Sequence, residues 1–441
     1  MNPTKDTALG VIPDEWETCP IGAFAQAAQY GLSVRGEATG RYPILRMNCQ
    51  LDGQVVFRNL QYVDLDQRTF ETFRLKRGDI LFNRTNSFEL VGRSAIYNDD
   101  APAVFASYLV RLSVDRSRVD PSYLNFLLNW DVAQIELKKL ASRGVSQANI
   151  SASKLQTFLV HLPTLSEQAD IAKVLTEVRR LMEREQELIA NLAALKNATV
   201  RQLFSQGLHG EAQKETEFGG VPDSWCIETL DHCAEVQTGV TKGRKLDGSN
   251  IIEVPYLRVA NVQDGHLDLS EMKSIPIRSS EIDRYRLHVG DIVLTEGGDF
   301  DKLGRGFIWR GELDLCIHQN HVFAVRPDRR RLLPEFFAYL SQSPYGKAYF
   351  LQVAHKTTNL ASINVTKLKA FPVLIPTIDE QREIVSVLEA VDRKIDLHKR
   401  KRSVIEELFR TLLNKLMTGE IRVSDLDRSM LAPAEEQEAA A

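Results

Sequence analysis

Apolar residues recur along two stretches of the chain with a spacing that alternates between four and three residues. The second stretch contains Ile384, Leu388, Val391, Ile395, Ile405, Phe409, Leu412 and Leu416, and the first contains Ile171, Leu175, Val178, Met182, Ile189, Leu192 and Leu203. A mean period of about 3.5 residues, sustained over several heptads, is typical of a coiled coil. Each stretch therefore predicts one long helix, ending beside a glycine (Gly207 or Gly419) that suits a helix C-terminus.

No third long helix is predicted that could cover the apolar face of either helix. We therefore expect the two predicted helices to cover each other's apolar face. We expect an antiparallel coiled coil, in which the polar ladder residues Glu185, Lys196, His398 and Arg402 set the register. The interface would consist of Ile171, Leu175, Val178, Ile189, Leu192, Leu203, Leu388, Val391, Ile395, Ile405, Phe409 and Leu412. Docking of each helix on its own domain is the alternative. The polar residues of 166–168 and 379–381 suit N-capping.

The whole chain repeats itself. Gly10-Val-Ile-Pro-Asp-Glu-Trp16 returns as Gly220-Val-Pro-Asp-Ser-Trp225, and Leu162-Pro-Thr-Leu-Ser-Glu-Gln168 returns as Ile375-Pro-Thr-Ile-Asp-Glu-Gln381. Leu75-Lys-Arg-Gly-Asp-Ile80 likewise matches Leu287-His-Val-Gly-Asp-Ile292. A register kept over so many motifs indicates a tandem duplication.

Each repeat begins with short β-branched and aromatic runs, such as Asp79-Ile-Leu-Phe82, between glycine, asparagine and aspartate turns. Such runs predict strands, and Pro121 and Pro334 suit helix starts. The predicted fold class is α+β, with two tandem-repeat globular domains separated by two long helices. The predicted parts are a first domain (1–162), a central helix (163–208), a second domain (209–375), a C-terminal helix (376–422) and an acidic flexible tail (423–441).

Charge and cysteine content narrow the class of protein. The chain of 441 residues has a net charge of −4, so any nucleic-acid surface must be a local basic patch. Five cysteines without a Cys-x-x-Cys pair indicate a reduced, cytoplasmic protein. Cys226, His232 and Cys233 match no zinc spacing, and we predict no metal site. No apolar run is long enough to predict export or a membrane span.

No catalytic constellation is present in the sequence. The chain lacks a P-loop, a Gly-x-Ser-x-Gly elbow and a His-Glu-x-x-His helix. A nuclease set built from Asp120, Glu136 and Lys138 is better explained by a charged helix surface. Asp79 and Asp291 follow glycine at strand starts and are interpreted as turn residues.

The duplicated Pro-Thr-x-x-Glu-Gln segments, each starting a long helix after a globular domain, resemble the specificity subunit of type I restriction–modification systems. The resemblance covers about residues 10–422. It implies a non-catalytic subunit of a DNA adenine methyltransferase and ATP-dependent endonuclease, whose two target-recognition domains read a bipartite, gapped double-stranded DNA sequence. It further implies two methyltransferase subunits docked on the helices and two restriction/translocase subunits in the full complex. S-adenosylmethionine, ATP and Mg²⁺ would belong to these partners, with no cofactor in this chain.

Base recognition requires side chains with planar or forked hydrogen-bonding groups on accessible loops. In the first domain the candidates are Asn83, Arg84, Thr85, Asn86, Arg143, Ser146 and Gln147. In the second domain they are Lys302, His318, Gln319, Asn320, Lys356, Thr357 and Asn359. The two sets match in position and differ in residue type, as expected if the domains read different sequences. Arg93 and Arg305 suit an ion pair or a phosphate contact, and the basic residues of 393–402 suit phosphates or solvent.

Two other functions stay open from the sequence. One is a non-DNA scaffold that holds protein partners through two domains on a coiled coil. The other is a nuclease or methyltransferase that acts alone, which added Mg²⁺ or S-adenosylmethionine would reveal.

Overall fold

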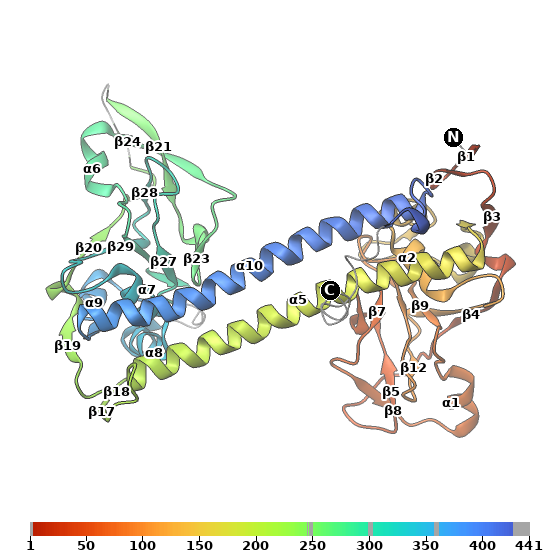
Figure 1. Cartoon of the computed structure of the whole chain (residues 1–441), viewed down its shortest axis with the longest axis horizontal. Coiled ribbons are helices and arrows are strands. Elements are labelled where there is room, and N and C mark those ends of the chain that lie inside the picture. The colour runs from red at the N-terminus through yellow and green to blue at the C-terminus, as the bar shows by residue number, and fades with distance from the viewer. Residues whose placement is uncertain (1–2, 245, 247–249, 299–302, 357–360, 427–441) are drawn as a thin grey trace, which may run out of the picture. The chain divides into compact units, whose positions relative to one another are not determined.

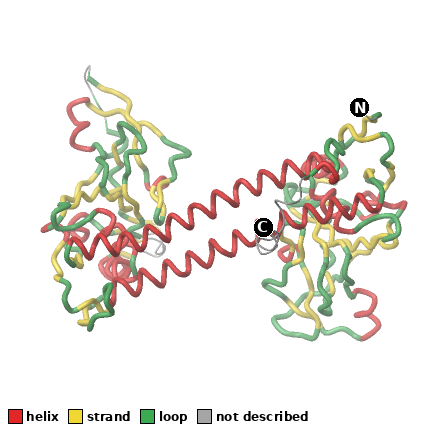
Figure 2. The backbone as a smooth tube through the Cα atoms, in the orientation of Figure 1, coloured by secondary structure: helices red, strands yellow, loops and turns green. Residues whose placement is uncertain are grey.

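The computed structural model describes residues 3–244, 246, 250–298, 303–356 and 361–426. The chain divides into two units, one formed by residues 1–186 and 400–441 and the other by residues 187–399. Each unit therefore contains one globular domain, part of the helix that follows it and part of the other long helix. Both units mix helix and strand (Figures 1 and 2), in agreement with the predicted α+β class.

Unit 1 contains sixteen strands in its described part: β1 (Thr4–Thr7), β2 (Gly10–Pro13), β3 (Glu17–Pro20), β4 (Ala25–Tyr30), β5 (Tyr42–Leu45), β6 (Gln50–Leu51), β7 (Gln54–Val55), β8 (Gln61–Val63), β9 (Ile80–Asn83), β10 (Thr85–Asn86), β11 (Ser94–Ile96), β12 (Val104–Phe105), β13 (Leu109–Val114), β14 (Ser142–Arg143), β15 (Ala148–Asn149) and β16 (Leu159–Leu162). Its helices are α1 (Gln67–Phe73), α2 (Pro121–Asn129), α3 (Asp131–Lys139), α4 (Ala152–Gln156) and the first part of α5 (Leu165–Gln206). The main sheet has the order β4-β13-β9-β11-β7-β6.

Unit 2 repeats this plan in its described residues with β17 (Gln213–Thr216), β18 (Gly219–Pro222), β19 (Cys226–Thr229), β20 (Ala234–Thr238), β21 (Ile251–Leu257), β22 (Val262–Gln263), β23 (His266–Leu267), β24 (Lys273–Arg278), β25 (Ile292–Thr295), β26 (Gly297–Gly298), β27 (Gly306–Ile308), β28 (Ile317–His318), β29 (Val322–Pro327), β30 (His355–Lys356), β31 (Ala361–Ser362) and β32 (Pro372–Ile375). Its helices are α6 (Ile282–Tyr285), α7 (Pro334–Gln342), α8 (Pro344–Val353), α9 (Val365–Lys369) and the first part of α10 (Ile378–Met417). Its main sheet has the order β20-β29-β25-β27.

The central strand of each main sheet begins with three apolar residues because both of its faces are covered. All four residues of β9 and all four of β25 are buried, which explains why these runs do not alternate with polar residues. The prolines predicted to start helices are confirmed, since Pro121 and Pro334 are the first residues of α2 and α7.

The two long helices predicted from the 3.5-residue period are confirmed as α5 and α10. Their N-caps differ from the prediction. The Oγ1 atoms of Thr164 and Thr377 accept the backbone N–H groups of Glu167 and Glu380, both at 3.3 Å. The threonine caps because it lies just before the first helical turn, whereas 166–168 and 379–381 already lie inside that turn. Gly207 and Gly419 have φ of +65° and +66°, as a C-terminal glycine requires.

A buried glutamine joins each long helix to its own globular domain. Gln168 Oε1 accepts the N–H of Asp120 at 2.9 Å, and its Nε2 donates to the carbonyls of Arg118 and Pro163. Gln381 makes the same three bonds in unit 2, to the backbone of Leu333, Arg331 and Pro376. The Glu-Gln motif is therefore a structural latch: its glutamine satisfies three backbone groups that would otherwise be unpaired.

Within each unit, the two long helices pack side by side in opposite directions (Figure 1). In unit 1, Ile171 and Leu175 share a core with Leu412 and Leu416. In unit 2, Leu203 shares a core with Leu388. The twelve predicted interface residues are all buried or half-buried.

Two of the predicted register-setting polar residues bridge the helices. Glu185 is buried and pairs with Lys401 at 2.7 Å in unit 1, and Lys196 pairs with Asp392 at 2.6 Å in unit 2. Arg402 instead pairs along its own helix with Glu406 at 3.6 Å. These cross-helix ion pairs fix which turns of the two helices face each other.

The first residues of the predicted tail are ordered against unit 1. Val423 is buried in its core, and the carboxylate of Asp425 accepts the backbone N–H of Arg422. Residues 427–441 lie outside the described part of the chain. Among the described residues, none of the helices combines the length and the apolar character needed to cross a membrane.

Candidate nucleic-acid interface

The two predicted DNA-contacting segments of the first domain meet in one small sheet. Its strand order is β10-β15-β14, with Thr85 and Ser142 both opposite Asn149. The N–H of Ile150 donates to the carbonyl of Arg84 at 2.9 Å. Segments about sixty residues apart in sequence thus become neighbours. We call this sheet, with the loops that extend it, the readout sheet of unit 1.

Two arginines of this readout sheet lie on aromatic rings. The Arg84 guanidinium is 4.6 Å from the centroid of the Tyr30 ring, and that of Arg143 is 3.8 Å from the Phe88 ring. Arg84 Nη1 also donates to the carbonyl of Ser107 at 3.3 Å. Cation–π stacking holds the guanidinium plane in one orientation. An oriented fork loses less entropy when it binds a guanine edge or a phosphate.

The remaining predicted residues of unit 1 fall into two groups. Ser146 and Gln147 are exposed in the β14–β15 turn, and Thr85 and Asn86 are half-buried. The Thr85 Oγ1 accepts from Asn149, and Asn86 Nδ2 lies 3.3 Å from the Met47 sulfur. Asn83 is different, because only 3% of it is exposed. Its place in the centre of the main sheet argues against direct contact with a base.

Exposed apolar side chains border the readout sheet, and residue-type reasoning did not select them. Val145 is fully exposed at the tip of the β14–β15 turn, and Tyr30, Phe88 and Tyr108 are between 37% and 47% exposed. A valine inside the polar run 142–147 was the available signal for Val145. The aromatic residues gave none, since only the fold places them beside Arg84 and Arg143. Apolar and aromatic groups contact thymine methyl groups and unstacked base steps.

Unit 2 builds the same readout sheet from different residues. Its strand order is β26-β31-β30, which joins segments 297–298, 355–356 and 361–362. Glu296 takes the place of Arg84: its N–H donates to the carbonyl of His321 at 3.0 Å, and its carbonyl accepts from Ile363 at 2.8 Å. The Glu296 carboxylate also contacts the Nδ1 atom of His321. The backbone frame is therefore kept while an arginine is replaced by a glutamate.

The predicted residues of unit 2 have mixed outcomes. Gln319 and Asn320 are half-buried beside His321. His318 is fully buried, its Nδ1–H donates to the carbonyl of Val322 at 2.6 Å, and burial lowers its pKa. This neutral, enclosed ring is in no position to contact DNA. Lys356 ends β30, where the backbone alone is described, and Lys302, Thr357 and Asn359 lie outside the described residues.

The two strand-start aspartates are confirmed as structural residues. Asp79 Oδ2 accepts the N–H of Lys76 at 2.8 Å, and Asp291 Oδ2 accepts that of His288 at 2.8 Å. Asp291 additionally binds Arg326 through both carboxylate oxygens at 2.8 Å, which raises the pKa of Arg326. Both carboxylates therefore close turns before the central strands rather than pointing at a ligand.

The amino-acid sequence is similar to those of known proteins. The family described as "Type I restriction modification DNA specificity domain" matches residues 13–194 and 222–407, which is most of the chain and both repeats. The chain belongs to this family. The MjaVIII type I restriction enzyme specificity subunit of Methanocaldococcus jannaschii is 24% identical, with 94% of this chain and 95% of the relative covered. A relative from the same organism, named for MjaX, is 26% identical with 95% and 96% covered.

A solved structure supports the fold of this specificity-domain protein. The type I restriction–modification S subunit from M. genitalium superposes with a TM-score of 0.55 at 16% identity, covering 91% of this chain and 96% of that one. At this identity the likeness establishes the fold alone.

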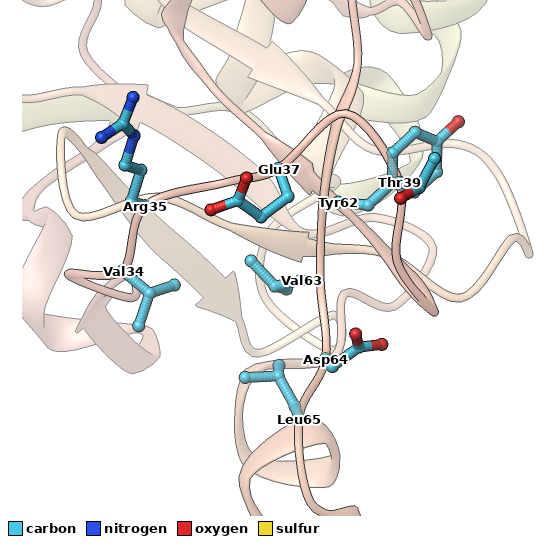
Figure 3. Close-up of a pocket in the computed structure, with 8 residues that line it drawn as sticks. All are labelled: Val34, Arg35, Glu37, Thr39, Tyr62, Val63, Asp64 and Leu65. Carbon is cyan, nitrogen blue, oxygen red and sulfur yellow. The ribbon is translucent and has the colours of Figure 1, made fainter.

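One small cavity of the specificity-domain fold lies away from the readout sheet. It measures about 250 Å³ and is lined by residues of the segments 34–39 and 62–65, among them Arg35, Glu37 and Asp64 (Figure 3). None of the predicted DNA-contacting residues lines it.

The described residues contain no cluster of three or more His, Cys, Asp or Glu side chains able to hold a metal ion. The five cysteines are free, as predicted, with Cys226 exposed and the other four buried.

Proposed function

We propose that this chain is the DNA-reading subunit of a type I restriction–modification complex, and that each unit reads one half of a bipartite, gapped target. The observation that carries this proposal is the repeated readout sheet. The backbone positions are the same in both units, yet Arg84 on Tyr30 in one unit corresponds to Glu296 against His321 in the other. Arginine pairs with guanine acceptors, whereas glutamate accepts from the cytosine amino group. Two such sheets would read two different half-sites.

We further propose that α5 and α10 form a continuous antiparallel coiled coil that spaces the two half-sites. The packing of the helices within each unit supports this, as do the cross-helix pairs of Glu185 and Lys196. A rigid spacer makes the distance between recognised bases independent of the sequence between them.

Partner subunits would dock on the same helices. Exposed apolar side chains remain on α5 and α10 outside the helix–helix seam: Leu188, Leu195, Val387, Leu397, Val404 and Leu408. Exposed apolar surface on a helix is suited to a protein partner. We propose two methyltransferase and two restriction/translocase subunits, which would carry S-adenosylmethionine, ATP and Mg²⁺. The chain itself would act in the cytoplasm on double-stranded DNA without catalysing a reaction.

Modification-sensitive sequencing tests the proposed function. DNA is taken from cells that express this chain with its cognate methyltransferase subunit, and from cells that express the methyltransferase alone. We expect a methylated, bipartite motif with an unread gap only when both are present. If the assembled complex produces no motif, the scaffold function is favoured. A continuous motif without a gap would contradict independent reading by two units.

A further inference from the structure

Unit 1 contains a second, larger cavity that DNA reading does not use. It measures about 680 Å³ and lies between the main sheet, α2 and the first part of α5. Three arginines line it, Arg77, Arg179 and Arg180, against a single carboxylate, that of Glu183. The polar side chains of Asn98 and Ser122 face the same space. The cavity therefore combines an excess of positive charge with hydrogen-bonding groups.

Arg179 is the unusual member of this lining. The residue is only 8% exposed, and its guanidinium lies 4.2 Å from the ring of Phe126 and 6.0 Å from that of Phe409. Its Nη1 atom is buried without a hydrogen-bond partner among the described residues. Burial lowers its pKa to about 10, so the group stays charged at neutral pH. A buried cation with an unmatched N–H is costly unless an anion completes its contacts.

The position in unit 2 that is equivalent to Arg179 carries a charged group whose side-chain partners come from the same unit. Residue 179 corresponds to Asp392 in unit 2, 213 positions later, while Phe126 corresponds to Tyr339 and Phe409 to Lys196. Tyr339 donates its hydroxyl to Asp392 Oδ2 at 2.7 Å, and Lys196 Nζ pairs with Asp392 Oδ1 at 2.6 Å. Unit 2 thus balances its half-buried charge with two side chains of its own. In unit 1 the equivalent positions are phenylalanines, which leave the cation facing the cavity.

We propose that this cavity binds a phosphate-bearing small molecule of nucleotide size, with the phosphate on Arg179 and Arg180. A phosphate monoester carries a charge of about −1.5 to −2 at neutral pH, which suits the arginine excess better than a single carboxylate does. Arg77 is shared with Asp100, at 3.2 Å, and is the weaker contributor. The volume falls within the range of about 300–1,000 Å³ typical of small-ligand sites. A bare phosphate would leave most of it filled with water. This site is independent of the proposed DNA readout.

Calorimetry of the binding of AMP, adenosine and inorganic phosphate to the purified full-length chain tests the proposal. The variants are Arg179→Met, which keeps the packing between the two phenylalanines, and Arg180→Gln, at an exposed residue. Arg184→Gln is the matched control, an exposed arginine on the same helix outside the lining. We expect AMP to bind the wild type and Arg184→Gln equally. Arg179→Met should bind AMP about tenfold or more weakly than the wild type does, and the wild type should bind adenosine about tenfold or more weakly than AMP. In each case a hydrogen-bonded ion pair is lost. Arg180→Gln should weaken it severalfold.

Four binding results would overturn the proposal, and a competition result would do so as well. The four are no binding of AMP at millimolar concentration, equal binding of AMP and adenosine, inorganic phosphate binding as tightly as AMP, and undiminished binding of AMP by both Arg179→Met and Arg180→Gln. Displacement of AMP by a short DNA duplex would also overturn it, because the phosphate would then come from nucleic acid. Circular dichroism of each variant separates lost binding from lost folding, and Arg180→Gln gives a result even if Arg179→Met unfolds.

Discussion

The two units of this chain keep the same residues at the glutamine latches and the N-terminal hairpins, and different residues where DNA would be read. Gln168 and Gln381 make the same three backbone bonds, and Lys5 and Lys214 bind the carbonyls of Asp14 and Asp223 at 2.8 Å in both N-terminal hairpins. At the readout sheets, by contrast, Arg84 corresponds to Glu296. A duplicated protein can change what it recognises because the latches and the readout positions use separate residues.

The largest effect on DNA recognition is expected when residues 10–162 are replaced by the first domain of another family member. We expect one half-site to change entirely while the other stays as it was, because each readout sheet is built within a single unit. Modification-sensitive sequencing of the hybrid with its methyltransferase gives both half-sites at once. A change in both halves, or in neither, would refute independent reading.

Lengthening both long helices by one heptad tests the part that the units share. The insertions follow Gln186 in α5 and Lys399 in α10, so that the 3.5-residue period is preserved in both. We expect both half-sites to persist with a wider gap, and the original site to be lost as a target. As a control, insertion in only one helix should disrupt packing and abolish modification, since the facing residues no longer match.

The glutamine latches predict equal damage in the two units. Gln168→Leu and Gln381→Leu each leave one partly buried N–H and two carbonyls, of which one is fully buried, without their side-chain partners. Unsatisfied buried groups cost about 1–3 kcal/mol each, so we expect each variant to lose about 3 kcal/mol or more of unfolding free energy. Denaturant unfolding of the full chain measures this. Replacement of the exposed Gln186 by leucine is the control, with no comparable loss expected. A large loss in one unit only would mean that the latches are not equivalent.

The readout positions predict unequal effects that are confined to one half-site each. Arg84→Ala should relax specificity in one half-site, at a cost of about 1–3 kcal/mol in binding, and Glu296→Ala should affect only the other half-site. Competition binding with DNA altered in one half at a time measures both. The buried Asn83 supplies the contrast: Asn83→Ala should alter stability before specificity. If Arg84→Ala weakens all sequences uniformly, Arg84 contacts phosphate rather than a base.

The smallest expected effect is a loss of stability at acid pH that the core of unit 1 contributes and the core of unit 2 does not. His161 is buried between Trp16 and Trp130, with ring centroids 5.5 and 6.1 Å away, and burial lowers its pKa to about 4. Its counterpart in unit 2 is Leu374. Between pH 6.5 and 4 the unfolded chain binds a proton that the folded chain does not, so stability falls as pH falls through this window. His161→Leu should remove about 2 kcal/mol of this loss at pH 5 and change the pH dependence little at pH 8. An unchanged slope would contradict a neutral, buried His161.

The sequence by itself determined the duplication and the two long helices. These features depend on period, on repeated motifs and on turn residues, which are local along the chain. The same local signals predicted the turn role of Asp79 and Asp291 correctly. They could also indicate which loops carry residues able to read bases, because residue type limits hydrogen-bonding chemistry.

Tertiary structure alone decided which of these residues meet and which are accessible. It placed segments 83–87 and 142–149 in one sheet, buried Asn83 and His318, and set Arg84 and Arg143 on aromatic rings that no local pattern connects with them. It also turned the Glu-Gln motif from an expected cap into a latch and left Arg179 facing a cavity. Burial and long-range hydrogen bonds depend on what packs against a residue from elsewhere in the chain, and the spacing of residues along the sequence does not contain that information.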